Sequence, residues 1–175
     1  MKLYRGVGDI DLNKLNEFFK SDKEGTYGFG MYFAYQKEMA RVWAVMRYIK
    51  KIGIIGEYEI KPPTNKLIVN QNGYNLEYDE LMENYKKDKF LYWRDLLKFY
   101  EKFDLIIDEG KEVCLKKESD LDLISFTIII QEYSNFTARD LFNELKVGEL
   151  VSDNEIIDIP ASALKLVQDY INQHQ

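Results

Sequence analysis

Three strand-like segments follow one another closely in this chain, and their spacing restricts the fold more than any other feature. They are Phe103–Ile107, Glu112–Leu115 and Leu121–Ile130, and each is rich in apolar and β-branched residues. Two parallel strands need a crossover of about a dozen residues or more, and only short connections separate these three segments. We therefore expect these three strands to be antiparallel to one another.

Apolar periodicity predicts the other elements of the chain. Alternation at period two predicts strands near residues 2–5, 52–60 and 155–159, and the second of these ends at the pair Pro62-Pro63. Helical spacing of three and four predicts helices near residues 11–20, 36–51, 78–87, 90–100 and 161–171. The order is mixed α+β, with strands and helices partly segregated along the chain.

The start of one further helix is marked by side chains. Thr137 followed by Asp140 forms the pattern of a capping box, and Phe136 and Leu141 stand where a hydrophobic staple would place them. This pattern predicts a helix that continues to about Lys146.

Length and composition indicate one folded unit. The chain has 175 residues, of which 46% are apolar, and no linker, low-complexity tract or internal repeat divides it. We expect a single domain over residues 1–175, in which residues 132–175 form a C-terminal addition of strand and helix.

The positions of the single histidine and the single cysteine disfavour several kinds of catalytic site. The only histidine, His174, stands one residue from the end of the sequence, which disfavours a Ser-His-Asp triad, a Cys-His pair or a histidine metal site. The only cysteine, Cys114, stands in an apolar strand pattern and is expected to be a core residue. We expect no metal and no disulfide.

Charge and hydropathy bear on partners and location. The net charge is -6, with 16 acids and 7 bases in residues 101–175, so binding to a nucleic-acid backbone is not favoured. The start of the sequence lacks a signal-peptide pattern, and the longest apolar run, near Leu123–Ile130, is too short to cross a membrane. A cytoplasmic protein without a membrane partner is expected.

One short segment places glycine directly beside aromatic residues. Gly28 and Gly30 flank Phe29 and precede Tyr32 and Phe33, so the backbone is least restricted just before two rings. Taken alone, each ring is ordinary in a chain with 13 tyrosines, and the pair would fit a strand with one ring in the core. The glycines would also allow the strand to approach a flat ligand closely.

Three segments together resemble a known family. They are Leu3-Tyr4-Arg5-Gly6, then Gly28-Phe29-Gly30-Met31-Tyr32-Phe33-Ala34 before a helix, then Lys111-Glu112-Val113-Cys114-Leu115. Their order and element types resemble the ADP-ribosyltransferase superfamily over roughly residues 2 to 130. The resemblance implies two small, mainly antiparallel sheets that form an NAD cleft, with helices around them.

The resemblance also implies roles for individual residues. Glu112 would stabilise the cationic transition state in which the bond between nicotinamide and ribose breaks, and Arg5 would hold a pyrophosphate or ribose oxygen. Tyr32 would stack on the nicotinamide ring, and the bare backbone of Gly6 would approach its carboxamide. Tyr4, Gly28, Gly30 and Phe33 complete the NAD-binding set that the resemblance implies.

Two branches of the superfamily are mixed in this chain. Arg5 stands where the histidine-tyrosine-glutamate branch has its histidine, and an arginine at that place is typical of the arginine-serine-glutamate branch of the cholera-like toxins. Phe103–Asp108 followed by Glu112 is similar to the closing strands of small phage-encoded transferases. The catalytic acid remains open: Glu112 ranks first, with Asp108 and Glu155 as alternatives.

The sequence favours a mono-ADP-ribosyltransferase that moves ADP-ribose from NAD to a macromolecular acceptor and releases nicotinamide. A protein acceptor is favoured, and an effector of phage or toxin type fits the resemblance. One alternative is a transferase-like fold that has lost activity and acts as a binding or inhibitor protein. A weaker alternative is a magnesium-dependent nuclease that uses Glu59 and Lys61, although residues 39–56 contain no acid that could lead into that strand.

Overall fold

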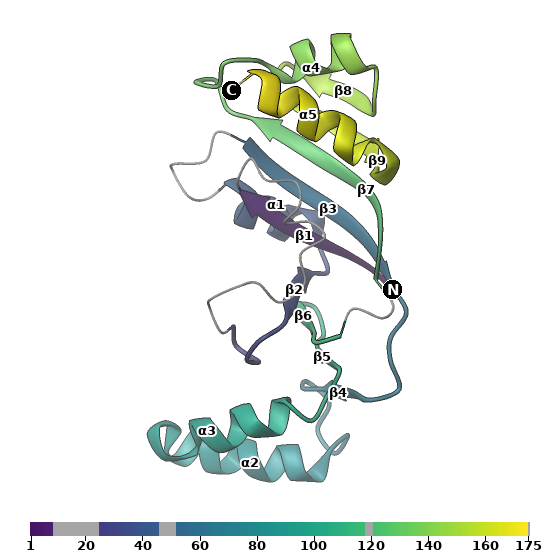
Figure 1. Cartoon of the computed structure of the whole chain (residues 1–175). Coiled ribbons are helices and arrows are strands. Elements are labelled where there is room, and N and C mark those ends of the chain that lie inside the picture. The colour runs from purple at the N-terminus through teal and green to yellow at the C-terminus, as the bar shows by residue number, and fades with distance from the viewer. Residues whose placement is uncertain (9–24, 46–51, 118–120, 175) are drawn as a thin grey trace. The chain divides into compact units, whose positions relative to one another are not determined.

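The structure is a computed structural model that describes residues 1–8, 25–45, 52–117 and 121–174. Its described strands are β1 (Lys2–Gly8), β2 (Met31–Ala34), β3 (Ile52–Ile60), β4 (Lys66–Ile68), β5 (Leu105–Asp108), β6 (Glu112–Leu115), β7 (Leu121–Ile130), β8 (Glu149–Ser152) and β9 (Glu155–Pro160). Its described helices are α1 (Lys37–Val45), α2 (Leu76–Lys87), α3 (Lys89–Tyr100), α4 (Ala138–Leu145), the 3-10 helix η2 (Ala161–Ala163) and α5 (Leu164–His174) (Figure 1). The α+β class is confirmed.

The described strands form one hydrogen-bonded series rather than two sheets. Its order is β4-β5-β6-β2-β1-β3-β7-β9-β8, and the pairs β1–β2, β1–β3, β3–β7, β5–β6, β7–β9 and β8–β9 are antiparallel, whereas β4–β5 is parallel. The expectation of two small sheets is therefore wrong. Strand β2 has a neighbour on each side in this series.

The chain divides into two compact units. Unit 1 comprises Met1–Glu17, Ala34–Ile60 and Leu121–Gln175, and unit 2 comprises Phe18–Phe33 and Lys61–Asp120. The single-domain organisation stays a prediction.

In unit 1, alternation along β3 and β7 directs side chains to two faces. Ile54 and Ile128 belong to one buried cluster, and their sequence neighbours Ile55 and Ile129 belong to another. The first cluster includes apolar side chains of α4 and α5, such as Leu141, so residues after 131 share the core of these strands. Both helices lie beside β7 and β9 (Figure 1).

The second face of unit 1 is covered by α1. A Cβ atom on Gly6 would lie 1.8 Å from the carbonyl oxygen of Ala40, so only a glycine lets α1 approach β1 this closely. Ala40 and Ala44 are fully buried in this contact. Small residues on both elements therefore set the distance between helix and strand.

Unit 2 combines short strands with a helical hairpin. Strands β4 and β5 are parallel, and the chain crosses between them through α2 and α3. Asp88 ends α2 and also caps α3, because its Oδ1 accepts a hydrogen bond from the Leu91 amide at 3.0 Å. The buried members of its core are Tyr27, Leu67, Tyr78, Leu96, Phe99, Tyr100, Ile106 and Cys114.

The predicted elements agree with the structure in part. Strands β5 and β6 form the expected antiparallel hairpin, whereas β7 pairs with β3 and β9 and not with β6. The helix expected near 11–20 lies outside the described residues, as does the part of the 36–51 helix after Val45. Strands β4 and β8 were missed, because three or four residues are too few to show alternation.

Candidate functional site

The glycine-aromatic segment forms a tight hairpin in unit 2. Gly25 and Gly28 exchange backbone hydrogen bonds of 3.2 and 3.1 Å, and Gly28 has a φ of 82°, where glycine is favoured. The hydroxyl of Tyr32 accepts a hydrogen bond from the Tyr27 amide at 2.9 Å and donates one to the Gly28 carbonyl at 2.6 Å. The hydroxyl of Tyr32 therefore holds this turn closed.

Two glycines of this hairpin make room for side chains of the same unit. A Cβ on Gly25 would lie 2.2 Å from Cζ of Tyr32, and a Cβ on Gly30 would lie 2.4 Å from Sγ of Cys114. The absent side chains therefore allow Tyr32 and β6 to pack against the loop. Close approach of a flat ligand to Gly28 and Gly30 stays a prediction.

Asp108, at the end of β5, is a buried carboxylate with several partners. Its Oδ2 accepts a hydrogen bond from the Tyr27 hydroxyl at 2.8 Å, and its Oδ1 accepts one from the Asn70 side-chain amide. The ammonium of Lys111 lies 3.8 Å from Oδ2. Because Asp108 is only 6% exposed, these groups hold its charge in place and leave little of it open to a ligand.

Glu112 opens β6 directly opposite Asp108. Residues opposed in an antiparallel pair point to the same face, so the two carboxylates are neighbours. Partial burial raises the pKa of the Glu112 carboxyl, and the charge of Asp108 adds to this effect. A hydrogen bond with Thr26 and the charge of Lys111 act in the opposite direction.

Glu112 also acts on the two tyrosines of the hairpin. Burial is the main reason why the pKa values of Tyr27 and Tyr32 are raised, and the charge of Glu112 contributes to both shifts. Unit 2 therefore contains Glu112, Tyr32 and Asp108, and their catalytic roles stay predictions. Phe33 is fully buried and serves as a core residue.

The other predicted site residues belong to unit 1. Arg5 lies opposite Gly56 on β3, and its guanidinium interacts with the hydroxyl of Tyr58. Burial raises the pKa of this hydroxyl, and Arg5 opposes that effect by charge and hydrogen bonding. Tyr4 pairs with Ala34 and packs beside α1, and the open side of Gly6 is filled by α1.

Glu155, the third candidate acid, lies on β9 in unit 1. Its Oε1 forms an ion pair with the guanidinium of Arg41 on α1. This pairing gives Glu155 a structural role that links α1 to β9. Among the three candidate acids, Glu112 is the one whose charge contributes to the raised pKa of Tyr32.

Sequence reasoning missed several residues of this cluster. Tyr27 and Asn70 hold Asp108, and Lys116 donates a hydrogen bond to the Tyr27 carbonyl at 2.6 Å. Asn70 stood in a segment that predicted only a turn, and Tyr27 preceded the motif without a recognisable pattern. Their roles depend on long-range contacts, which leave no periodic signal.

The cysteine, the histidine and the acid of the nuclease alternative each have contacts of their own. Burial raises the pKa of the Cys114 thiol to about 11, which fits the predicted core role. The His174 ring stacks on Tyr170, with ring centroids 4.0 Å apart. Glu59, of the nuclease alternative, accepts a hydrogen bond from the Met1 amine at 2.6 Å.

Within residues 1–8, 25–45, 52–117 and 121–174, no group of three or more His, Cys, Asp or Glu side chains is arranged to hold a metal ion. None of the helices there has both the length and the apolar character needed to span a membrane.

Comparisons with protein-family models, with curated proteins and with solved structures gave no match to this chain. The resemblance to ADP-ribosyltransferases therefore rests on the three sequence segments alone.

Proposed function

We propose that this protein is a mono-ADP-ribosyltransferase that uses NAD and releases nicotinamide. The observation that supports the proposal best is that Glu112 and Tyr32, from distant segments, belong to the same unit, where the charge of Glu112 contributes to the raised pKa of Tyr32. The Glu112 carboxylate is half-buried on the first residue of its strand. The cytoplasmic location and a protein acceptor remain part of this proposal.

The reaction requires little from the protein beyond a negative charge near the ribose and correct positioning of NAD. As the bond between nicotinamide and C1′ of the ribose breaks, both bonding electrons leave with neutral nicotinamide and positive charge develops on the ribose. The Glu112 carboxylate would stabilise that charge, and the acceptor would then attack C1′ and lose a proton. The ring of Tyr32 would stack on the nicotinamide. The role of Arg5, which belongs to unit 1, stays a separate prediction.

The raised pKa of Glu112 is compatible with this role. Desolvation strengthens the interaction of a carboxylate with a nearby positive charge, because less water screens the two. The same desolvation raises the free energy of the ionised carboxylate when no ligand is bound. Groups whose pKa is shifted in this way are common at functional sites.

A second candidate is a transferase-like protein that binds without turnover. It is favoured by the packing of the motif glycines, since the open sides of Gly6 and Gly30 are filled by Ala40 and Cys114. The nuclease alternative ranks last.

The test measures nicotinamide released from NAD by the purified protein, with and without a cell lysate as a source of acceptor. Glu112→Gln keeps size and polarity but removes the charge, so the rate should fall by roughly a hundredfold or more. The affinity for NAD, followed by thermal shift, should change far less. Glu109→Gln, an exposed acid on the same hairpin, is the matched control and should leave the rate unchanged.

The outcomes separate the three candidates. Release that survives Glu112→Gln would reject the assigned acid. A thermal shift with NAD but no release would favour the inactive binder. No shift at millimolar NAD, together with magnesium-dependent cleavage of DNA, would favour the nuclease.

A further inference from the structure

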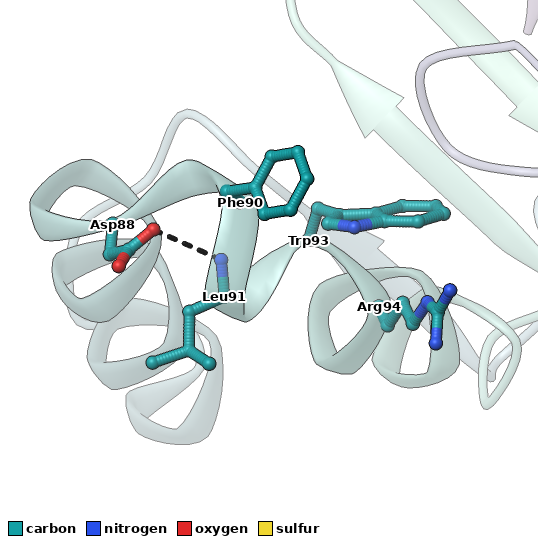
Figure 2. A pocket seen from close by; sticks show the side chains of 5 residues that line it. All are labelled: Asp88, Phe90, Leu91, Trp93 and Arg94. Atoms are coloured by element: carbon teal, nitrogen blue, oxygen red, sulfur yellow. Dashed lines mark hydrogen bonds between the residues drawn. The ribbon is translucent and has the colours of Figure 1, made fainter.

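The corner between α2 and α3 exposes large apolar side chains. Phe90 is 92% exposed, Leu91 64% and Trp93 41%. With Asp88 and Arg94 they line a hollow of about 650 Å³, and Figure 2 shows the rings of Phe90 and Trp93 projecting from successive turns of α3. We call these five residues the corner surface. Exposed apolar groups that gather in this way often mark a binding site.

The sequence around the corner surface is rich in positive charge. Lys86, Lys87, Lys89, Arg94 and Lys98 stand within thirteen residues that contain two acids, Asp88 and Asp95, although the whole chain has a net charge of -6. Phe90, Arg94 and Lys98 are spaced four residues apart, so they form one ridge along α3. One open ring is therefore followed by two cations along this ridge.

One ring is already arranged for stacking. The guanidinium carbon of Arg94 lies 5.4 Å from the centroid of the Trp93 ring, in a cation-π contact. This contact restrains the indole without burying it, so a planar group can still reach the indole. An ordered aromatic platform loses less entropy when a planar ligand binds.

The same flank of α3 leads towards the glycine hairpin of unit 2. Leu97 stands four residues after Trp93, and its Cδ2 lies 4.0 Å from the position of a Cβ on Gly28. Nζ of Lys116 lies 3.5 Å from the same position. A strand bound along this flank would run from Phe90 towards the hairpin that holds Tyr32.

We infer that the corner surface binds single-stranded nucleic acid. Bases would stack on Phe90 and Trp93, and phosphates would lie near Arg94 and Lys98. Proteins that bind single strands without sequence preference combine stacking rings with cations in this manner, and a base that stacks on a protein ring must first be unstacked. The inference does not depend on the transferase proposal.

A membrane surface is the strongest competitor, because aromatic rings and lysines are also typical of interfacial segments. Asp88 argues against it. Its carboxylate lines the hollow at the apex of the corner, and insertion of the apex would remove this charge from water. A single strand can pass along the ridge and leave Asp88 solvated.

The test is fluorescence anisotropy with fluorescein-labelled 20-nucleotide oligo(dT) and oligo(U), which distinguish DNA from RNA. We expect binding of at least one of them, weaker binding as salt rises, and weaker binding of a duplex of the same length. Phe90→Ala and Trp93→Ala should each reduce affinity by roughly tenfold or more, as expected for the loss of one stacked base. Leu76→Ala, an exposed apolar side chain elsewhere on α2, should have no effect.

Trp93→Ala retains Trp43, so intrinsic fluorescence provides a second measurement. Quenching by oligo(dT) or oligo(U) should be present in the wild type and lost in Trp93→Ala. The inference is overturned if neither oligonucleotide binds, or if both ring variants bind as tightly as the wild type. It is also overturned if the protein binds phosphatidylcholine vesicles containing phosphatidylserine but neither oligonucleotide.

Discussion

Asp108 and Glu112 are opposed carboxylates on one hairpin, yet their surroundings differ. Asp108 receives hydrogen bonds from Tyr27 and Asn70, which compensate the removal of its charge from water. Glu112 is partly buried beside a second negative charge. Thr26 and Lys111 only partly offset the unfavourable free energy of ionising it there, so its pKa is raised. Asp108 thus stabilises the hairpin, whereas the ionised form of Glu112 is disfavoured by its surroundings.

This difference predicts how Glu112→Gln changes stability with pH. A raised pKa in the folded protein means that folding is disfavoured once Glu112 is ionised, above its ordinary value of 4.5. Glu112→Gln should therefore be more stable than the wild type at pH 7 to 8. The difference should disappear as the pH falls below about 4, where the unfolded chain is also protonated.

Urea unfolding at several pH values would measure this difference, with Glu109→Gln as the control for removal of an exposed charge. A Glu112→Gln variant that is less stable at pH 7 would show that the carboxylate is favourably paired. That result would contradict the electrostatic description of the site.

Among the elements, α4 begins as its sequence pattern indicates. The Asp140 amide donates to the Thr137 hydroxyl at 3.1 Å, and the Thr137 amide donates to the Asp140 carboxylate at 2.8 Å. Both members of the staple, Phe136 and Leu141, are buried in the core of unit 1. The predicted capping box is confirmed.

Thr137→Ala should destabilise the protein by about 1 kcal/mol, because it leaves the first amides of α4 without their side-chain acceptor. The measurement is the free energy of unfolding in urea. Thr137→Ser keeps the hydroxyl and should recover most of the loss. A full loss in Thr137→Ser would point instead to the methyl group of Thr137 as the important part.

Across the molecule, neither compact unit is a continuous piece of chain. Unit 1 takes three segments and unit 2 takes two, and the boundary at Phe33–Ala34 falls within β2. Because the chain passes repeatedly between the units, neither unit can unfold as a separate terminal piece of the chain. We therefore expect one cooperative unfolding transition.

Two variants test this expectation, one in each unit. Thr137→Ala weakens unit 1, and Tyr27→Phe weakens unit 2 by about 1 to 3 kcal/mol, because it removes a buried donor to Asp108. Both should move the same transition, whether it is followed by circular dichroism or by tryptophan fluorescence. Two transitions, each moved by only one variant, would show that the units unfold separately.

The candidate site could be predicted only in part from the chain. The segments of Tyr32 and Glu112 were found because each carries a short motif, and unit 2 does contain both. Their partners Tyr27 and Asn70 carry no motif, because each acts on Asp108 from a distant part of the sequence. The packing role of Gly30 was missed for the same reason, since the atom that excludes a side chain belongs to Cys114.

Local sequence was enough to place most of the described helices and strands, because periodicity and caps act over a few residues. The alternation of Ile52–Ile60 matches β3, and the Thr137 pattern places the start of α4. Strand order was not accessible in this way: the single series, the parallel β4–β5 pair and the position of β7 between β3 and β9 depend on pairing between distant segments. Tertiary structure alone decided that Asp108 is buried and Glu112 only half-buried, since burial depends on which distant side chains cover each carboxylate.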